Sequence, residues 1–217
     1  WMVFGLDEAE LRNVLCMLGK VIKFSLSNGL NLHVPIGGKF AELYVASELW
    51  KHKPKLGQQR NVVVGVKHPA SCDIVLEKTK KKVEVKWSAL HHSGNDPFAK
   101  RYANIPFWGW GFSTGKQFLD KKFDYCILFA ARKDEAYPQH ILVIKCEEMT
   151  KDSLGGLRSS ALYSKGSFYI EYSHNREFYY RRRWYPKGPS PLEEDIFKNR
   201  DKYEERWFEL KEKGMLQ

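Results

Sequence analysis

The amino-acid sequence predicts an α/β fold in which a mixed central sheet is flanked by helices. Two segments near the N-terminus place apolar residues at helical spacing, and five later segments have the composition of strands. The helical segments are residues 7–22 and about 39–52, and the strand segments are 61–67, 73–77, 83–87, 123–131 and 140–145. Tight connections between the first three strands favour antiparallel pairing, and the order of elements implies a sheet with mixed pairing.

The two predicted helices are bounded by capping and turn residues. Asp7 is the expected N-cap of the first helix, and Asn28-Gly29 marks the turn after it. Gly37-Gly38 is expected to precede the second helix, and Pro54 and Gly57 are expected to end it.

The later segments differ in their expected burial. Residues 83–87 alternate apolar and charged side chains, as is typical of a strand buried on one face, whereas 123–131 is a continuous apolar run typical of a central strand. Residues 90–115 show no clean period and are long for a structureless loop, which indicates a functional segment or an undetected helix. A short helix is expected at 116–122.

The C-terminal third is expected to be less regular. Residues 147–165 are predicted to be helical or irregular, and 166–172 to form a strand. The segment 174–187 is basic and aromatic. Residues 192–213 alternate charges at helical spacing, which is typical of a solvated terminal helix or of one that contacts a second subunit.

Length and composition indicate one domain with a basic surface. The chain has 217 residues, of which 43% are hydrophobic and 29% charged. We expect a core at about 37–146, preceded by the helix at 7–22 and followed by additions at 150–217. The formal net charge of +10 favours a polyanionic partner, nucleic acid first and an anionic membrane surface second, although many soluble proteins are basic without one.

The expected compartment is the cytoplasm. We find no signal peptide and no apolar run long enough to span a membrane. The four cysteines form no C-x-x-C pair and no histidines lie at zinc-finger spacing, so a structural zinc site is not expected. Cys16, Cys126 and Cys146 lie in apolar runs and are expected to be buried thiols, as in a reducing compartment.

A hairpin is predicted around a lysine-rich turn. With a two-residue loop at Thr79-Lys80, Val75 lies opposite Glu84, and Asp73 opposite Lys86. Because side chains alternate with period two, Asp73, Glu84 and Lys86 then share one face, whereas a loop with an odd number of residues would scatter them. The apolar residues expected on the other face are Ile74, Leu76, Val83, Val85 and Trp87.

We call Asp73, Glu84 and Lys86 the acid–lysine cluster. Two close carboxylates raise one another's pKa unless a cation lies between them, and Mg²⁺ prefers carboxylate oxygens while keeping several waters. A metal-acidified water can attack phosphorus, and a nearby lysine can orient or deprotonate that water or stabilise the transition state. The cluster therefore predicts Mg²⁺-dependent phosphodiester hydrolysis, and a solvated strand edge is the alternative.

The spacing of the cluster resembles a known nuclease motif. Asp73, followed after ten residues by Glu84-Val85-Lys86, resembles the D…E-x-K motif of the PD-(D/E)XK nuclease superfamily, which includes many type II restriction endonucleases and Holliday-junction resolvases. The superfamily core of helix, three-stranded meander, helix and strand is similar to the order predicted for about 39–145, roughly half the chain. The proline of the motif usually sits just before the aspartate, whereas Pro69 lies four residues upstream.

The resemblance implies a Mg²⁺-dependent endonuclease that acts on double-stranded DNA. Asp73 and Glu84 would bind the metal, and Lys86 would act on the water or the transition state. An acidic residue of the first core helix often joins the site, and Glu42 occupies the matching place. A restriction endonuclease is favoured because the segments outside the core can read sequence, and a double-strand cut favours a homodimer. The alternatives are a structure-specific resolvase or repair nuclease, and a basic nucleic-acid-binding module without catalysis.

Basic residues outside the cluster are the candidate DNA contacts. We give the name arginine run to Arg181, Arg182 and Arg183. These residues lie among aromatics, which can stack on unpaired bases while arginine binds phosphate or guanine edges. Lys100, Arg101 and His91 lie in the segment that follows the cluster strand. A solvent-exposed or packing role is the alternative for each of them.

Overall fold

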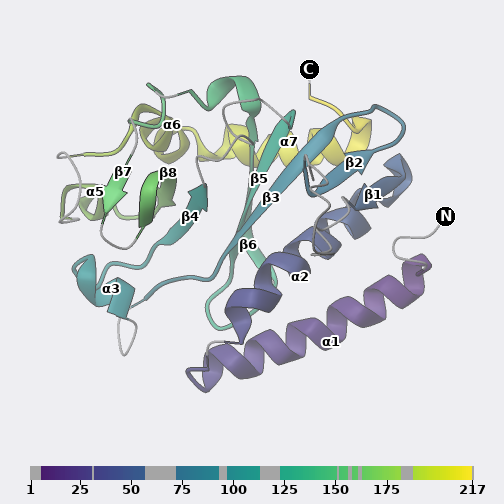
Figure 1. Ribbon diagram of the computed structural model, residues 1–217, viewed down its shortest axis with the longest axis horizontal. Helices are drawn as coiled ribbons and strands as arrows, with labels where there is room; N and C mark the ends of the chain where they lie inside the picture. Colours follow the sequence, from purple (N-terminus) through teal and green to yellow (C-terminus); the bar gives the residue numbers. More distant parts are fainter. Residues whose placement is uncertain are drawn as a thin grey trace.

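A mixed five-stranded sheet forms the centre of the protein (Figure 1). The structure is a computed structural model, and it describes residues 6–30, 32–56, 72–92, 97–112, 123–150, 152–155, 158–160, 163–181 and 188–216. The sheet order is β1-β2-β3-β5-β6, and only the β3–β5 pair is parallel. Its strands are β1 (Pro54–Leu56), β2 (Ile74–Leu76), β3 (Lys82–Ser88), β5 (Tyr125–Ala131) and β6 (Pro138–Lys145). The predicted α/β class with a mixed sheet is confirmed.

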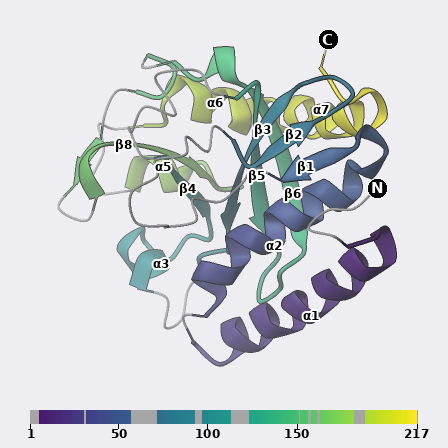
Figure 2. The same cartoon turned by 45° about the vertical axis from the view of Figure 1, so that its right-hand side comes forward.

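The central strand β5 separates two apolar cores. Every residue of β5 is buried, as expected for a continuous apolar run. Tyr125, Ile127 and Phe129 face the core formed with helices α1 (Glu8–Ser27) and α2 (His33–Glu48), which lie side by side in Figure 2. The alternate residues of β5 face a second core on the other side of the sheet, which contains aromatic residues of a smaller sheet. These alternate residues are Cys126, Leu128 and Ala130.

The first helix begins where the sequence predicts. The Asp7 carboxylate accepts a hydrogen bond from the Glu10 N–H, and the Glu10 carboxylate accepts one from the Asp7 N–H, both at 2.8 Å. This capping box satisfies two backbone donors at the helix start. The helix continues to Ser27, five residues beyond its predicted end, and Gly29 then adopts a left-handed turn.

The second helix begins earlier than predicted. It starts at His33, so Gly37-Gly38 lies inside α2 instead of preceding it, which corrects the expectation. A Cβ atom on Gly37 would lie 2.6 Å from the ring of Trp87 on β3, so the glycine permits close packing of the helix on the sheet. The helix ends at Glu48 and is followed by a 3₁₀ turn, Trp50–His52.

The edge strand beside β2 in the described residues is β1, which was not predicted. Pro54, expected only to end the second helix, begins β1, which pairs antiparallel with β2. The proline is tolerated because β1 is an edge strand. The predicted strand at 61–67 and the short helix at 116–122 lie outside the described residues. The expected antiparallel pairing of the other two hairpin strands, β2 and β3, is confirmed.

A second sheet, of order β4-β8-β7, covers the other face of the central sheet. The segment 90–115 contributes a short helix, α3 (Pro97–Arg101), and the strand β4 (Trp108–Phe112), so it does contain an undetected helix. The predicted strand at 166–172 is confirmed within β8 (Tyr163–Tyr172). The prediction of a helical or irregular segment at 147–165 is wrong in part, because β7 (Arg158–Ser160) is a strand paired with β8.

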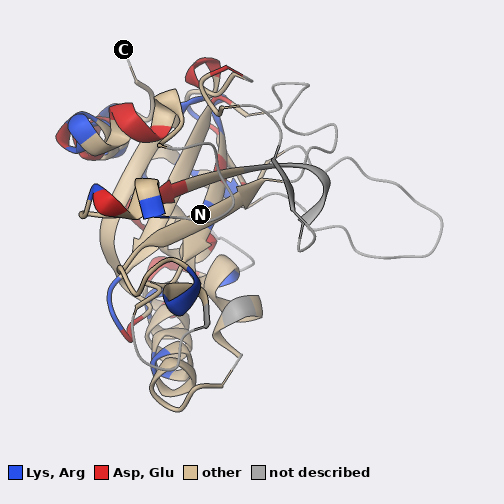
Figure 3. Ribbon diagram, turned by 90° about the vertical axis from the view of Figure 1, so that its left-hand side faces the viewer, with Lys and Arg blue, Asp and Glu red and all other residues tan. Residues whose placement is uncertain are grey.

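The C-terminal helices are not simply solvated. The segment 192–213 divides into α6 (Pro191–Lys198) and α7 (Arg200–Lys213), and α7 packs along the edge strand β6. Charged residues of both signs are mixed along α7, as Figure 3 shows, but its inner side is apolar. Its buried residues are Tyr203, Trp207 and Leu210, spaced by four and three. The prediction of a solvated helix is therefore wrong for this inner side, because the charge pattern concealed the apolar stripe.

The burial of the cysteines agrees only in part with the prediction. All four cysteines are thiols, and Cys126 is buried as predicted. Cys16 is exposed and Cys146 is half-buried, so their predicted burial is wrong or incomplete. Among the helices of the described residues, none combines the length and the apolar character that crossing a membrane requires.

Candidate active site

The predicted hairpin brings the acid–lysine cluster together, but in a different register. Ile74 pairs with Val83 and Val75 with Lys82, so continuing the ladder puts Asp73 opposite Glu84 and not Lys86. The turn is two residues longer than predicted, and Lys80 in it adopts a left-handed backbone. A shift of two residues keeps every side chain on its predicted face.

The two faces of the hairpin are those that the sequence predicts. Ile74, Leu76, Val83 and Val85 are buried in the core beneath the N-terminal helices, and Trp87 packs against it. Glu84 alternates with these residues on β3 and pairs with Cys126, which belongs to the core beneath the second sheet. The burial of the apolar set therefore fixes the cluster on the side of the second sheet.

Lys86 and Glu84 form a close ion pair. The Lys86 Nζ atom lies 2.5 Å from the Glu84 Oε1 atom, and the two side chains are 30% and 10% exposed. Asp73 is held from the other strand, because its Oδ2 atom accepts a 2.7 Å hydrogen bond from the Val85 N–H. These contacts fix two carboxylates and one ammonium group at the start of the β2–β3 hairpin.

The electrostatics of the cluster indicate an excess of negative charge. Burial and the negative charge of Glu84 raise the pKa of Asp73 to about 7, and Glu42 adds to this effect. The Val85 N–H and the Lys86 charge oppose the increase. Burial disfavours the charged form of Lys86, but the charge and hydrogen bond of Glu84 outweigh it and raise the pKa of Lys86.

Glu42 lies on helix α2. It forms an ion pair with Lys39, three residues earlier on the same helix, and its side chain is 16% exposed. Its influence on the pKa of Asp73 shows that it belongs to the same electrostatic environment. The predicted fourth member therefore acts on the cluster through its charge, and that charge is paired with Lys39.

Two further residues border the cluster and were not predicted. Phe112, at the end of β4, places its ring 5.9 Å from the Lys86 Nζ atom. Cys126 is fully buried beside Glu84, and burial together with that negative charge raises the pKa of its thiol. Cys126 follows from the parallel β3–β5 register, which single-sequence patterns do not provide, and Phe112 from a strand whose alternating glycines hid it.

The donor set fits a hard divalent cation. Within the described ranges, no group of three or more His, Cys, Asp or Glu side chains surrounds a common metal position. Mg²⁺ typically takes one or two protein carboxylates and completes its coordination with water and phosphate oxygens, so Asp73 and Glu84 match its requirement. Burial and the charge of Glu84 raise the pKa of Asp73, and a divalent cation bound between the two carboxylates would favour its charged form.

The candidate DNA contacts are scattered over the second sheet and its helices. His91 packs between aromatic rings, with centroids 4.9 Å from Phe107 and 5.2 Å from Phe98. Lys100 is exposed on α3, and Arg101 lies over the Phe98 ring. Arg181, at the end of α5 (Glu177–Arg181), is exposed and pairs with Glu177 at 3.1 Å. The other two members of the arginine run lie outside the described residues.

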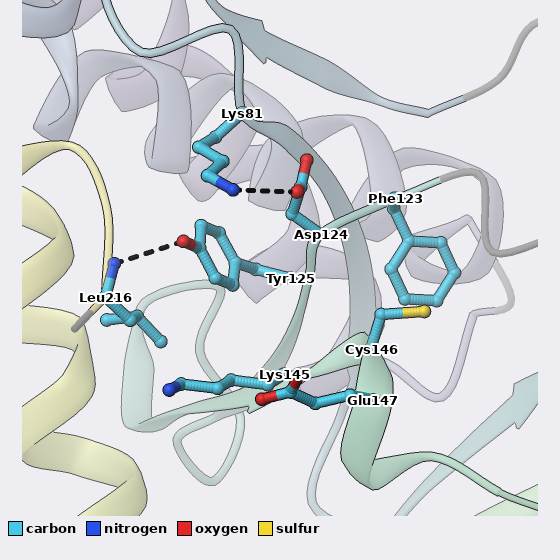
Figure 4. A pocket seen from close by; sticks show the side chains of 8 residues that line it. All are labelled: Lys81, Phe123, Asp124, Tyr125, Lys145, Cys146, Glu147 and Leu216. Atoms are coloured by element: carbon cyan, nitrogen blue, oxygen red, sulfur yellow. Dashed lines mark hydrogen bonds and ion pairs between the residues drawn. The ribbon is translucent and has the colours of Figure 1, made fainter.

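A cavity of about 430 Å³ lies where β5 begins and β6 ends (Figure 4). Lys81 points toward Asp124, with 3.0 Å between Nζ and Oδ1, and the Tyr125 hydroxyl accepts a hydrogen bond from the Leu216 N–H. None of the lining residues belongs to the acid–lysine cluster. Because these polar groups satisfy one another, we assign no chemistry to the cavity.

Comparison with protein families, with curated proteins and with solved structures finds no match. The chain is therefore assigned to no family. The features that bear on its function are the acid–lysine cluster and the net charge of +10.

Proposed function

We propose that this protein is a Mg²⁺-dependent DNA endonuclease of the PD-(D/E)XK type. The observation that carries the proposal is the cluster itself, in which Asp73 and Glu84 converge with Lys86 at 2.5 Å from one carboxylate. The order α2, β1-β2-β3, then β5 beside β3 supports the proposal for part of that core, while the helix predicted at 116–122 between the meander and β5 lies outside the described residues.

Each residue of the cluster would have a separate role in hydrolysis. Asp73 and Glu84 would hold the metal, which would neutralise charge on the phosphate and make a bound water more acidic. Lys86 is an ammonium group at neutral pH and donates hydrogen bonds toward the reacting phosphate or its attacking water. Glu42 orients water from α2 and releases Lys39 in doing so.

The substrate proposed is double-stranded DNA. A net charge of +10 favours a polyanion, and exposed cations such as Lys100 and Arg181 flank the second sheet. The second sheet and helices α5 and α6 lie outside the nuclease core and are the elements available to read sequence. Sequence-specific restriction is therefore favoured over structure-specific resolution or repair, in a cytoplasmic enzyme whose cysteines stay reduced.

We further propose that two chains act together, because one site per chain cuts one strand. A second copy is the partner that the exposed apolar side of α1 fits. Its residues Met17, Val21 and Phe24 are exposed and follow one another at helical spacing. The mass of the free protein and of its complex with a short DNA duplex, measured in solution, tests this association.

Incubation with supercoiled plasmid tests the function. With Mg²⁺ the protein should produce discrete fragments, whose sequenced ends define the site, and a chelator should stop the reaction. Random nicking or cleavage only at junctions would favour the resolvase or repair alternative. Tight DNA binding without cleavage of any DNA or RNA would support a binding module and overturn the proposal.

A further inference from the structure

Two histidines meet on the same face of the central sheet as the acid–lysine cluster, but at the edge strand β6, which β5 separates from the cluster strand β3. His140 lies on β6 and His174 follows β8, and their Nε2 atoms are 3.2 Å apart. We call them the histidine pair. His140 is largely buried, while His174 is exposed, so an ion can reach the gap between them from solvent.

The outer nitrogen of His140 is fixed by a carboxylate. Its Nδ1 atom lies 2.5 Å from the Glu204 Oε1 atom, on α7. A carboxylate accepts hydrogen bonds, so the ring proton resides on Nδ1 and the Nε2 atom presents a lone pair toward His174. A carboxylate behind an imidazole is the arrangement that orients histidine ligands and raises their basicity in metal sites.

The outer nitrogen of His174 can take either role. Its Nδ1 atom lies 3.2 Å from the Tyr172 hydroxyl, which can donate or accept. With the proton on Nε2, His174 donates to His140. With the proton moved to Nδ1 it donates to Tyr172, and two Nε2 lone pairs then face each other. Two facing lone pairs repel each other unless a cation lies between them. A cation can bind here without releasing a proton to solvent, because the His174 proton only moves from Nε2 to Nδ1.

The spacing of the rings fits such a cation. Two nitrogens bound to one Zn²⁺ ion at about 2.05 Å, with a near-tetrahedral angle, are separated by about 3.3 Å, close to the observed 3.2 Å. Rings aligned head-on through a hydrogen bond of this length would have centroids about 5.5 Å apart. The two ring centroids are 5.0 Å apart, so the rings are not collinear. They are tilted so that both Nε2 atoms point toward a common position to one side of the line that joins them.

Neighbouring side chains hold this geometry. The buried ring of Trp108 meets both histidines edge-on, at centroid distances of 5.4 and 5.6 Å. Arg200 lies 3.6 Å from Glu204, so the carboxylate is shared between a cation and His140. The contacts join β6, the end of β8 and α7, three elements that are distant in sequence.

We propose that the histidine pair binds a transition-metal ion that prefers imidazole, of which Zn²⁺ is the representative. His140 and His174 supply two nitrogens, and water fills the remaining positions, because no third His, Cys, Asp or Glu of the described chain joins them around one position. The bound ion would link β6 of the central sheet to the end of β8, and Glu204 would add α7 to the link. We call this metal-bound arrangement of His140 and His174 the clamp. The clamp shares no residue with the acid–lysine cluster and does not depend on the nuclease proposal.

Calorimetric titration with Zn²⁺ tests the clamp, with excess Mg²⁺ present to occupy the carboxylates. Every protein used in the titration, including the parent, carries Cys16→Ser, which removes an exposed thiol that competes for zinc. The decisive variant is His174→Gln, because it removes the exposed ligand of the pair and leaves the buried His140 in place. The matched control is His92→Gln, since His92 also pairs with a carboxylate, Asp134, at 3.5 Å. Glu204→Gln probes the carboxylate behind His140.

The clamp predicts one bound Zn²⁺ per chain and unchanged binding in the His92 control. His174→Gln should weaken binding at least tenfold, and Glu204→Gln about tenfold. At a Zn²⁺ concentration about a hundredfold above the dissociation constant, the thermal midpoint should rise by about 5 to 10 °C. The absence of Zn²⁺ binding, or His174→Gln binding as tightly as the parent protein, would overturn the proposal and leave a hydrogen-bonded pair.

Discussion

Replacing Lys86 by methionine separates a chemical role from a structural one. The change keeps an unbranched apolar stem and removes the ammonium group that lies 2.5 Å from Glu84. If Lys86 only balances the two carboxylates, bound Mg²⁺ replaces that charge and cleavage continues. If Lys86 stabilises the transition state or positions water, cleavage slows even when metal and DNA are saturating.

The expected loss of cleavage rate can be calculated from the burial of Lys86. Lys86 is 30% exposed, so an effective dielectric constant of about 20 applies. A unit charge about 5 Å from charge developing on the phosphate is then worth about 3 kcal/mol. That corresponds to a rate about two hundredfold lower. The metal-free protein should also lose about 1 to 2 kcal/mol of stability, because the buried Glu84 carboxylate loses its partner.

The assay is the single-turnover cleavage rate on bound DNA at saturating Mg²⁺. The matched control is Lys82→Met, which removes an exposed lysine from the same strand, and it should cleave at the rate of the unaltered protein. A thermal melt of each variant in Mg²⁺ confirms that the fold survives.

A small loss of cleavage rate in Lys86→Met would refute a catalytic role for Lys86. A rate within about fivefold of the unaltered protein, in a folded Lys86→Met variant, corresponds to less than about 1 kcal/mol and is too little for a direct role. Such a result would remove Lys86 from the catalytic residues and weaken the resemblance that rests on the E-x-K spacing.

Three further predictions concern DNA contacts, acid stability and packing. Replacing the arginine run by alanine should flatten the slope of log affinity against log salt by about 0.9 per lost phosphate contact, and an unchanged slope would exclude such contacts. The Tyr203 hydroxyl is the main cause that lowers the pKa of Asp195 to about 2, so its stabilisation is present above pH about 4 and lost as the pH falls toward 2. Asp195→Ala should accordingly lower the melting temperature at pH 6 but little at pH 2, and a constant difference would refute this. Gly37→Ala should destabilise by about 1 to 3 kcal/mol in denaturant titrations because its Cβ meets Trp87, whereas Gly38→Ala, with open space around it, should stabilise by about 0.5 to 1 kcal/mol; equal effects would contradict this packing.

The alternation of apolar and charged side chains along the hairpin strands made the cluster predictable from the sequence. The apolar set of Ile74, Val83 and Val85 had to be buried together, and this requirement alone fixed which face Asp73 and Glu84 occupy. It fixed the parity of the hairpin loop and not its length, because a two-residue shift leaves both faces unchanged. The pairing partner of Asp73 was therefore mispredicted while its location was correct.

Features that depend on tertiary contacts escaped prediction. Gly37 resembled a helix boundary until its contact with Trp87 was known, and the apolar stripe of α7 was masked by its charges. The histidine pair is 34 residues apart in sequence, so no ligand spacing could reveal it. Each of these features is created by elements that meet only in the folded chain.

Isosteric variants of Asp73 and Glu84 test whether these two carboxylates support metal-dependent DNA cleavage. The measurement compares Mg²⁺-dependent plasmid cleavage and DNA binding by the unaltered protein, Asp73→Asn, Glu84→Gln and the control Asp152→Asn, which alters an exposed carboxylate outside the cluster. Both cluster variants should lose cleavage while binding DNA as well or better, because repulsion of phosphate is removed, and the control should cleave normally. Cleavage within about twofold of the unaltered protein in either cluster variant would contradict it.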